Sequence, residues 1–220
     1  VAGFMQIVQS YRKYFNMDAS GVGSNSWVID SSRSLSGKPI IANDPHLTLP
    51  APSKWFEMHL TAPGWNVAGV SFPGSPFIII GHNAKIAWAL TNAMIDESDF
   101  YIEKLDSTKL DSVRQNKTPL QYLYDKKSIP IESHEEIIRI GKDDSITINV
   151  RRTHHGPIIS DVHPSTEKVK NSKLISMRWA GSDVSKESYA LYLINKSNNA
   201  QDFVRGVREF AVPGQNISYA

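Results

Sequence analysis

Short β-like runs separated by turn residues constrain the fold of this chain more than any other feature of its sequence. Six such runs lie between residues 26 and 90, and Gly, Pro, Ser or Asn residues interrupt the chain between several of them. Within the fifth run, Ile78, Ile79 and Ile80 are continuously apolar, which is typical of a strand covered on both faces. The expected strands cover residues 26–30, 39–42, 55–62, 65–72, 77–80 and 86–90.

Apolar residues three and four positions apart predict helices at both ends of the chain. In the last helix, Phe203, Val207 and Phe210 form the expected buried stripe, and Asn199 is the expected N-cap. The expected helices cover residues 1–16, 188–194 and 200–210.

Residues 101–175 differ in composition from the rest of the chain. They are dense in Lys, Asp and Ser, and apolar residues alternate with polar ones near 137–140 and 146–150. This pattern predicts an antiparallel, half-exposed β excursion, and residues 174–179 are expected to form another strand. The chain as a whole is predicted to be α+β, with more strand than helix.

Composition excludes several classes of protein. The net charge of +2 gives no strong electrostatic case for nucleic-acid binding. No apolar run reaches the roughly 18 residues of a membrane-spanning helix. Cysteine is absent, which excludes disulfides and thiolate chemistry. Because the chain opens on Val1 and residues 216–220 resemble an unfinished strand, we expect a fragment of a longer protein.

Two standard motif interpretations fail on inspection. The string nearest to a Gly-x-Ser-x-Gly nucleophile elbow, residues 69–73, lacks the last glycine. His154 and His155 could bind a metal, but adjacent residues in a strand point to opposite faces. Packing or surface hydrogen bonding is therefore the expected role of these two histidines.

The segment around Ser24 is the most informative part of the sequence. A Gly-rich stretch runs through Gly23 into Ser24 and then directly into an expected strand. This arrangement fits either an ordinary loop that enters a strand or a self-processing site. In the second case the Ser24 hydroxyl attacks the Gly23 carbonyl, and glycine leaves that carbonyl unobstructed and tolerates a strained backbone. The freed α-amine of Ser24 would then serve as the base.

The Ser24 segment and several later motifs together resemble the penicillin acylase family of N-terminal nucleophile amidohydrolases. The match covers most of residues 20–220 and is weak over 101–150. The resemblance implies a four-layer αββα core, here incomplete, with residues 1–23 as the end of the α-chain or linker and 24–220 as the first part of the β-chain. The motifs that carry it are 23–28, 42–47, 73–74, 81–83, 87–92, 96–99, 152–157 and 214–220.

The resemblance also implies catalytic roles. Ser24 matches the nucleophile, with chain cleavage between Gly23 and Ser24. The Asn92 backbone N–H matches half of the oxyanion hole, and the family's second donor, an asparagine, would lie beyond Ala220. His46 matches an orienting residue that hydrogen-bonds the α-amine or the substrate, although a histidine that merely ends a strand has the same local pattern.

Substrate and metal residues follow from the same comparison. Leu47, Ile80 and Leu90 match positions that line the acyl pocket, and three aliphatic residues there favour aliphatic acyl groups over phenylacetyl. Ordinary core packing is the alternative for these three. The resemblance further implies a Ca²⁺ site at Asp96, Ser98 and Asp99, which otherwise fits a solvated turn. No organic cofactor is implied.

The expected function is amide hydrolysis through an acyl-enzyme on an N-terminal serine. The partners would be a small-molecule amide and the remaining α- and β-chain segments of the parent protein, with no nucleic acid and no membrane span. The family implies a periplasmic or secreted location. The 220 residues by themselves are expected to be inactive. A catalytically inactive scaffold that keeps the fold is the alternative, and a conventional serine hydrolase is a more distant one.

Overall fold

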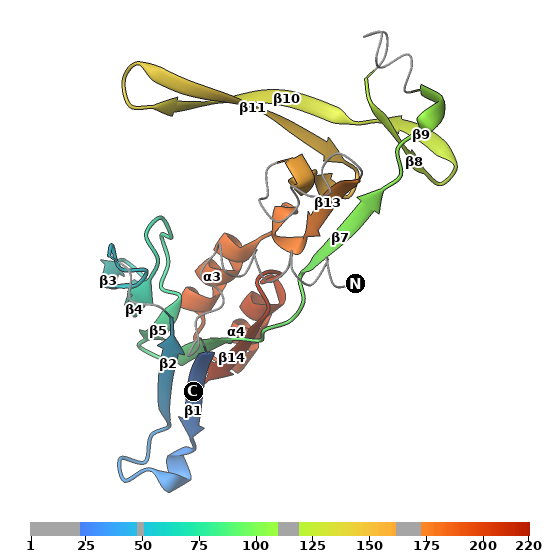
Figure 1. Ribbon diagram of the computed structural model, residues 1–220. Coiled ribbons are helices and arrows are strands. Elements are labelled where there is room, and N and C mark those ends of the chain that lie inside the picture. Colours follow the sequence, from blue (N-terminus) through green and yellow to red (C-terminus); the bar gives the residue numbers. More distant parts are fainter. Residues whose placement is uncertain (1–22, 48–50, 110–118, 162–172) are drawn as a thin grey trace. The chain divides into compact units, whose positions relative to one another are not determined.

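The computed structural model describes residues 23–47, 51–109, 119–161 and 173–220 (Figure 1). The helix expected over residues 1–16 lies outside them. The described residues divide into two compact units. Residues 98–182 belong to one unit, and residues 23–97 and 183–220 belong to the other.

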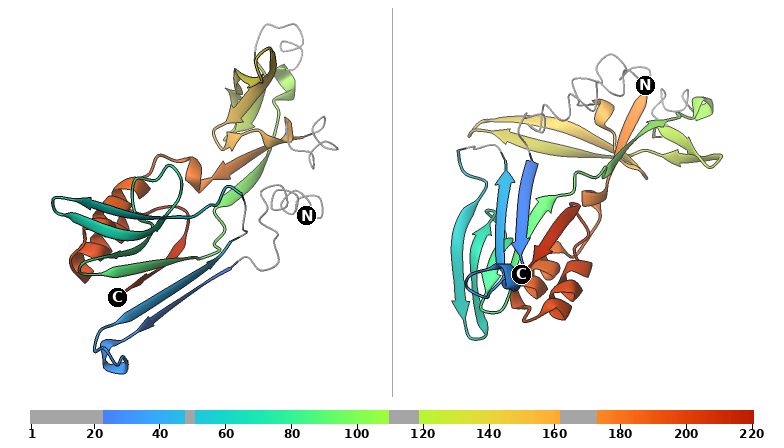
Figure 2. Two further views of the ribbon diagram at one scale, coloured as in Figure 1. Left: turned by 90° about the vertical axis from the view of Figure 1, so that its left-hand side faces the viewer. Right: turned by 90° about the horizontal axis from the view of Figure 1, so that it is seen from below.

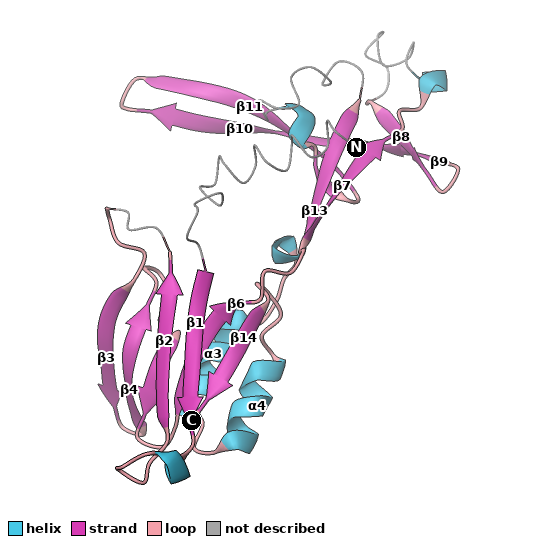
Figure 3. Ribbon diagram, turned by 60° about the horizontal axis from the view of Figure 1, so that its bottom comes forward, coloured by secondary structure: helices cyan, strands magenta, loops and turns pink. Residues whose placement is uncertain are grey.

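The unit of residues 23–97 and 183–220 is built on a five-stranded antiparallel sheet with the strand order β14-β6-β5-β4-β3 (Figure 3). Its last strand in sequence, β14, joins the sheet beside β6 and so brings the end of the described chain next to residues 87–92. The strands are β3 (Phe56–Ala62), β4 (Trp65–Ser71), β5 (Ile80–Asn83), β6 (Ala87–Asn92) and β14 (Gln215–Tyr219).

Glycine is required where β4 and β5 approach each other. Gly69 and Gly81 are cross-strand partners, and Gly69 has a φ of +152°. A Cβ atom on Gly69 would lie 2.2 Å from the Ile80 carbonyl oxygen, and one on Gly81 would lie 2.2 Å from the Ala68 carbonyl oxygen. Any side chain at either position would therefore push the two strands apart.

Two helices, α3 (Glu187–Lys196) and α4 (Ala200–Arg208), cover one face of this sheet. Their side chains Ile194 and Phe203 are buried in a cluster with Trp88 and other sheet residues. The predicted N-cap is confirmed, because the Asn199 side chain accepts a hydrogen bond from the Asp202 N–H at 2.9 Å. The helical prediction for this part of the chain is thus correct to within a few residues at each end.

The expected strand over residues 77–80 is mostly absent. Strand β5 begins only at Ile80, and Ile78 is fully buried outside any strand. The carboxamide of Asn195 in α3 explains this, because it accepts from the Ile78 N–H at 2.9 Å and donates to the Ile78 carbonyl at 2.8 Å. A helix side chain therefore takes the place of a neighbouring strand at Ile78, whereas the Ile79 N–H still donates to the Val70 carbonyl of β4 at 3.0 Å.

A second, two-stranded sheet of β1 (Gly23–Ile29) and β2 (Ile40–His46) lies on the opposite face of the large sheet from the helices (Figure 2). The alternating directions of the side chains along β14 show that the helices and the two-stranded sheet lie on opposite faces. Ile217 and Tyr219 pack into the cluster that contains the helix residues, whereas the Ser218 hydroxyl accepts from the Ser26 hydroxyl of β1 at 2.9 Å.

The unit of residues 98–182 consists of small antiparallel sheets of two or three strands, in the region where the sequence predicts an excursion over 101–175. Tyr122, Ile131, Ile158 and Leu174 form its small buried core. Short 3-10 turns lie at Ser107–Lys109, Ile159–Asp161 and Ala180–Ser182, the last of them after the final strand of the unit. The strands are β7 (Ser98–Glu103), β8 (Gln121–Tyr124), β9 (Lys127–Pro130), β10 (Glu132–Ile140), β11 (Asp144–Thr153), β12 (Gly156–Pro157) and β13 (Leu174–Trp179).

Strands outnumber helices throughout the described chain, so the α+β prediction is confirmed. Within those same residues, no helix is long and apolar enough to cross a membrane.

Candidate active site

A cavity of about 530 Å³ lies within the unit of residues 23–97 and 183–220. It is lined from the two-stranded sheet, the five-stranded sheet and the helical segment. Five residues that the sequence singles out for catalysis or substrate binding all line this one cavity: Ser24, Leu47, Ile80, Leu90 and Asn92.

Ser24 lies on the face of β1 that points toward the large sheet. Side chains two residues apart in a strand share a face, and Ser26 demonstrates the direction through its hydrogen bond to Ser218. The Ser24 hydroxyl donates to the Gly23 carbonyl oxygen at 2.6 Å. The hydroxyl is therefore next to the peptide bond that the self-processing hypothesis requires it to attack.

Gly23 has open space around it apart from its chain neighbours. A Cβ atom at this position would meet no atom within 4 Å, and the φ angle of Gly23 lies outside the left-handed region. That glycine suits attack on this carbonyl by Ser24 stays a prediction. Gly23 sits in regular strand pairing opposite His46.

The hydrogen-bond ladder between β6 and β14 determines where the Asn92 N–H points. Ala87 and Ala220 exchange hydrogen bonds in both directions, and the Ala93 N–H donates to the Gly214 carbonyl. By alternation, the backbone N–H groups of Leu90 and Asn92 point away from β14, toward the β5 side. Strand β5 pairs with β6 only as far as Trp88, so no β5 residue lies opposite Asn92 in the ladder.

The Asn43 side chain takes the place of β5 at Leu90. Its Oδ1 accepts from the Leu90 N–H at 3.1 Å. The N–H of Asn92 is the next group along the same edge of β6, and Asn92 lines the cavity with Ser24. This position suits a backbone donor to an oxyanion that forms on a substrate attacked by Ser24.

His46 is placed differently from the other predicted catalytic residues. It lies opposite Gly23 on the outer face of β2, its side chain is 45% exposed, and its Nε2 is 2.7 Å from the Asp44 carboxylate. It is not among the residues that line the cavity. Asp44 is thus the contact that orients the His46 ring.

Aromatic side chains also line the cavity, and the sequence analysis did not identify them. Trp55 and Phe72 contact each other with ring centroids 4.1 Å apart, and Phe210 lines the cavity from the segment after α4. The helical pattern assigned Phe210 to the buried stripe of α4, but the helix ends at Arg208. The wall is therefore mixed aliphatic and aromatic, and only its aliphatic part was predicted.

Within the described part of the chain, Glu187 is the one ionisable side chain that lines the cavity. Its carboxylate accepts from the N–H groups of Ala211 at 3.2 Å and Val212 at 3.0 Å, and also from the Ser185 hydroxyl. Burial raises the pKa of the Glu187 carboxyl, but these hydrogen bonds outweigh it and hold the pKa below its ordinary value. Glu187 is thus negatively charged, and its hydrogen bonds hold residues 210–213 in place as part of the cavity wall.

The residues expected to hold Ca²⁺ do not form a complete site. Asp99 is exposed in β7, and its cross-strand partner is Arg178. Across residues 23–47, 51–109, 119–161 and 173–220, no three His, Asp or Glu side chains are grouped in a way that could hold a metal. Asp96, Ser98 and Asp99 are suitable ligand types, but alone they fall short of the six to eight oxygens that Ca²⁺ takes.

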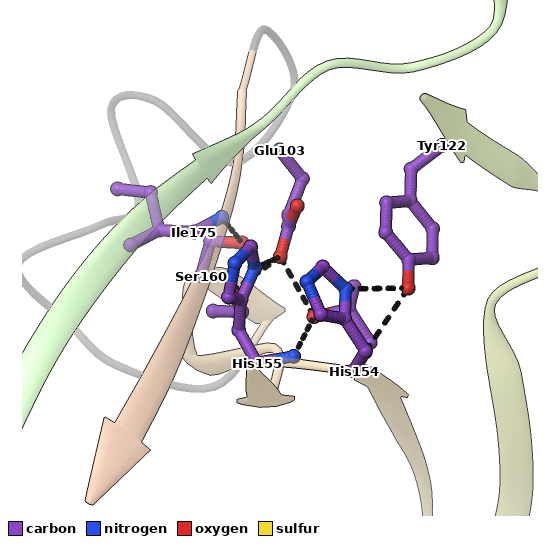
Figure 4. A network of polar contacts seen from close by, with 8 residues as sticks. Glu103, Tyr122, His154, His155, Ser160 and Ile175 are labelled. Carbon is purple, nitrogen blue, oxygen red and sulfur yellow. Dashed lines mark hydrogen bonds and ion pairs between the residues drawn. The ribbon is translucent and has the colours of Figure 1, made fainter. Parts of the chain in front are cut away.

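A separate polar cluster surrounds Glu103 in the unit of residues 98–182 (Figure 4). The Glu103 side chain is 4% exposed, and one of its oxygens accepts from the hydroxyls of Thr153 at 2.7 Å and Ser176 at 2.5 Å. His155 Nδ1 lies 2.9 Å from the same oxygen. Burial raises the pKa of Glu103, but the hydrogen bonds from Ser176, His155 and Thr153 together hold it below its ordinary value.

His154 and His155 belong to this cluster and do not point to opposite faces. They lie in the turn between β11 and β12 rather than in a strand, and their ring centroids are 3.7 Å apart. The His155 ring stacks on Tyr101, and the Tyr122 hydroxyl lies 2.9 Å from His154 Nδ1. The expectation of packing and hydrogen bonding is confirmed, and the expectation of opposite faces is wrong because the turn brings both rings together.

Comparisons with known proteins agree with these features. The family model described as Penicillin amidase matches residues 3–220. The chain therefore belongs to the penicillin amidase family. A solved structure of a thermostable penicillin G acylase from Alcaligenes faecalis superimposes with a TM-score of 0.71 at 23% identity, covering 89% of this chain and 33% of that chain. The fold is accordingly that of a penicillin acylase.

Curated relatives include acylases of two kinds. The chain is 34% identical over 161 residues to an acyl-homoserine lactone acylase, QuiP, of Pseudomonas aeruginosa, which is 73% of this chain and 18% of that protein. It is 29% identical over 161 residues to a penicillin G acylase of Escherichia coli, again 73% of this chain and 18% of that protein. The chain thus spans about a fifth of the length of these relatives.

Proposed function

We propose that this chain carries the nucleophile and one oxyanion donor of a self-processing amidohydrolase. The observation that supports this most strongly is the single cavity shared by Ser24, Asn92 and the three aliphatic residues Leu47, Ile80 and Leu90. These residues come from separate segments of the sequence, and the fold brings them to the same cavity.

Processing would begin when the Ser24 hydroxyl attacks the Gly23 carbonyl carbon. The peptide bond between Gly23 and Ser24 breaks as an ester forms on Oγ, and water then hydrolyses the ester. The products are a carboxylate at Gly23 and a free α-amine at Ser24. This amine matters because an amide nitrogen is not basic, whereas an α-amine has a pKa of about 7.7–8.0 and can accept the hydroxyl proton.

Hydrolysis of a substrate amide would repeat the same chemistry. The Ser24 hydroxyl attacks the amide carbonyl while the α-amine takes its proton, and the Asn92 N–H stabilises the oxyanion. The proton then passes to the leaving amine, and water hydrolyses the acyl-enzyme. One such oxyanion donor is worth about 2.7–4 kcal/mol in comparable sites.

The finer features of the family follow as part of the proposal. The outer face of β1 leaves Trp27 53% and Ile29 42% exposed. A further layer of the complete protein over this face would give the four-layer αββα core. Asp96, Ser98 and Asp99 would contribute oxygens to a Ca²⁺ site completed by other segments, and the protein would act in the periplasm or outside the cell. The 220 residues alone would remain uncut and inactive without a second oxyanion donor.

Labelling by a serine-directed sulfonylating agent tests the proposal. The complete natural protein is treated with phenylmethylsulfonyl fluoride, digested and mapped by mass spectrometry. The proposal predicts an adduct on the peptide that begins at Ser24 and a parallel loss of amide hydrolysis. A folded protein with neither labelling nor hydrolysis would instead support an inactive scaffold that keeps the fold.

A further inference from the structure

The nucleophile and the oxyanion donor lie in two different sheets. Ser24 is in β1 of the two-stranded sheet, and Asn92 is in β6 of the five-stranded sheet. No strand of one sheet pairs with a strand of the other among the described residues. The distance between the two groups therefore depends on side chains that connect the sheets, because no backbone ladder spans them.

The carboxamide of Asn43 makes such a connection. Its Nδ2 donates to the Asn25 carbonyl at 2.9 Å, and its Oδ1 accepts from the Leu90 N–H at 3.1 Å. Asn25 directly follows Ser24, and Leu90 precedes Asn92 by two residues, which is about 7 Å along a strand. One planar side chain thus holds the backbone beside the nucleophile and the backbone beside the oxyanion donor.

We propose that Asn43 is a positioning residue for hydrolysis, which sets the distance between the Ser24 hydroxyl and the Asn92 N–H. The inference rests on the proposed function of the same site. Asn43 itself is not among the residues that line the cavity with Ser24, so it acts through the two strands and not on the substrate. Aspartate could keep the contact to Leu90 but has no N–H for the Asn25 carbonyl, whereas alanine loses both contacts.

Ser26 provides a matched control. Its hydroxyl also connects β1 to the large sheet, but it reaches Ser218 of β14 and not β6. Loss of this hydrogen bond weakens the attachment of β1 by one side-chain contact and leaves the Asn43 connection in place. A general loosening of β1 would affect both variants, whereas the positioning role affects only Asn43.

The experiment compares Asn43→Ala, Asn43→Asp and Ser26→Ala in the complete natural protein, in material confirmed to be folded and cut before Ser24. A misplacement of about 1 Å can reduce the rate 100-fold, so kcat of Asn43→Ala is expected to fall about 100-fold with little change in KM. Asn43→Asp is expected to lose kcat as well, and Ser26→Ala to retain it. An unchanged kcat in Asn43→Ala, or an equal loss of kcat in Ser26→Ala, would overturn the positioning role. The proposed function would still stand in that case, because it is supported by amide hydrolysis in the wild type.

Amide hydrogen exchange at Leu90 gives a readout that does not depend on activity. Asn43→Ala should lose protection of the Leu90 N–H, and Asn43→Asp should keep it because an acceptor remains. Equal protection of Leu90 in the wild type and Asn43→Ala would overturn the inference directly. A wild-type protein that hydrolyses no amide would refute the proposed function and the positioning role together, and the exchange result would then report only whether the contact forms.

Discussion

Gln215 donates a hydrogen bond from Nε2 to Oδ1 of Asn92 at 2.9 Å, and the two residues are direct partners across β14 and β6. The side chain of Asn92 is thereby engaged with its cross-strand neighbour. The backbone N–H of Asn92 points to the other edge of β6, away from this contact.

Substitutions at Asn92 separate the backbone donor from the side chain. Asn92→Pro removes the N–H without removing a ladder hydrogen bond, because that N–H points away from β14. We expect kcat to fall by about 10²–10³. Asn92→Ala keeps the N–H and should retain most of the activity. Steady-state kinetics on the complete protein measure both, and an equal loss in the two variants would assign the effect to the side chain.

The lining of the cavity predicts a preference for neutral acyl groups. Leu47, Ile80 and Leu90 offer aliphatic surface, and each buried methylene contributes about 0.8 kcal/mol, or roughly fourfold in kcat/KM. We expect kcat/KM to rise as the acyl chain lengthens along a series of linear acyl amides, until the cavity is full. A clear preference for phenylacetyl over hexanoyl or octanoyl amides would contradict the assignment and would point to the aromatic wall of Trp55 and Phe72.

A glutaryl amide is the matched control in that series. Among the residues that the structure describes, no Lys, Arg or His lines the cavity, and Glu187 contributes a negative charge. A second carboxylate on the acyl chain would lose its hydration without gaining a cationic partner. Its kcat/KM should therefore lie well below that of a neutral chain of similar length.

Stability of the unit of residues 98–182 should depend on pH through Glu103. Its pKa in the folded state lies below its ordinary value, so it stabilises the fold above the ordinary glutamate pKa of about 4.3, and this contribution is lost as the pH falls through the lower folded value. Burial and the neighbouring His155 lower the pKa of His154, which acts in the same direction below about pH 6.5.

Thermal unfolding between pH 7 and pH 3 tests this dependence. The Tm of the wild type should fall with pH, and Glu103→Gln should show a shallower fall because the titrating carboxylate is gone. Glu135→Gln changes an exposed carboxylate of β10 in the same unit and should keep the wild-type slope. Identical slopes of Tm against pH for the wild type and Glu103→Gln would show that Glu103 is not the source of the pH dependence.

Calcium should raise the Tm of the complete protein if Asp96 and Asp99 contribute to a metal site. A ligand that binds only the folded state stabilises it by mass action. Asp96→Ala and Asp99→Ala should each reduce the calcium response, whereas Asp143→Ala, at an exposed turn, should leave it unchanged. A full response in both site variants would mean that the metal binds elsewhere.

The sequence predicted the parts of this fold that local pattern controls. Alternating runs located the strands of the large sheet, and the Asn199 cap marked the start of α4. Local pattern failed to predict the structure where tertiary contacts determine it. The buried segment at Ile78 is held by Asn195 from α3, more than a hundred residues later, and no periodicity in the segment itself encodes that partner.

The candidate site shows the same difference between features set by local sequence and features set by tertiary contacts. Ser24, Leu47 and Leu90 were identified through motifs, but the aromatic wall of Trp55 and Phe72 depends on how separate loops meet, which no motif marks. Asn43 lies inside the motif of residues 42–47, but its contacts to Asn25 and Leu90 depend on the placement of the two sheets, which the motif does not encode. The direction of the Asn92 N–H follows from the register between β6 and β14, which no motif encodes.

The intact mass of the complete natural protein tests the central claim most directly. The account predicts two chains, one of which begins at Ser24, and predicts that Ser24→Ala stays as a single chain while Ser26→Ala is cut normally. A wild-type protein that is folded, hydrolyses amides and remains uncut between Gly23 and Ser24 would contradict it, because Ser24 would then lack the α-amine that the mechanism requires as its base.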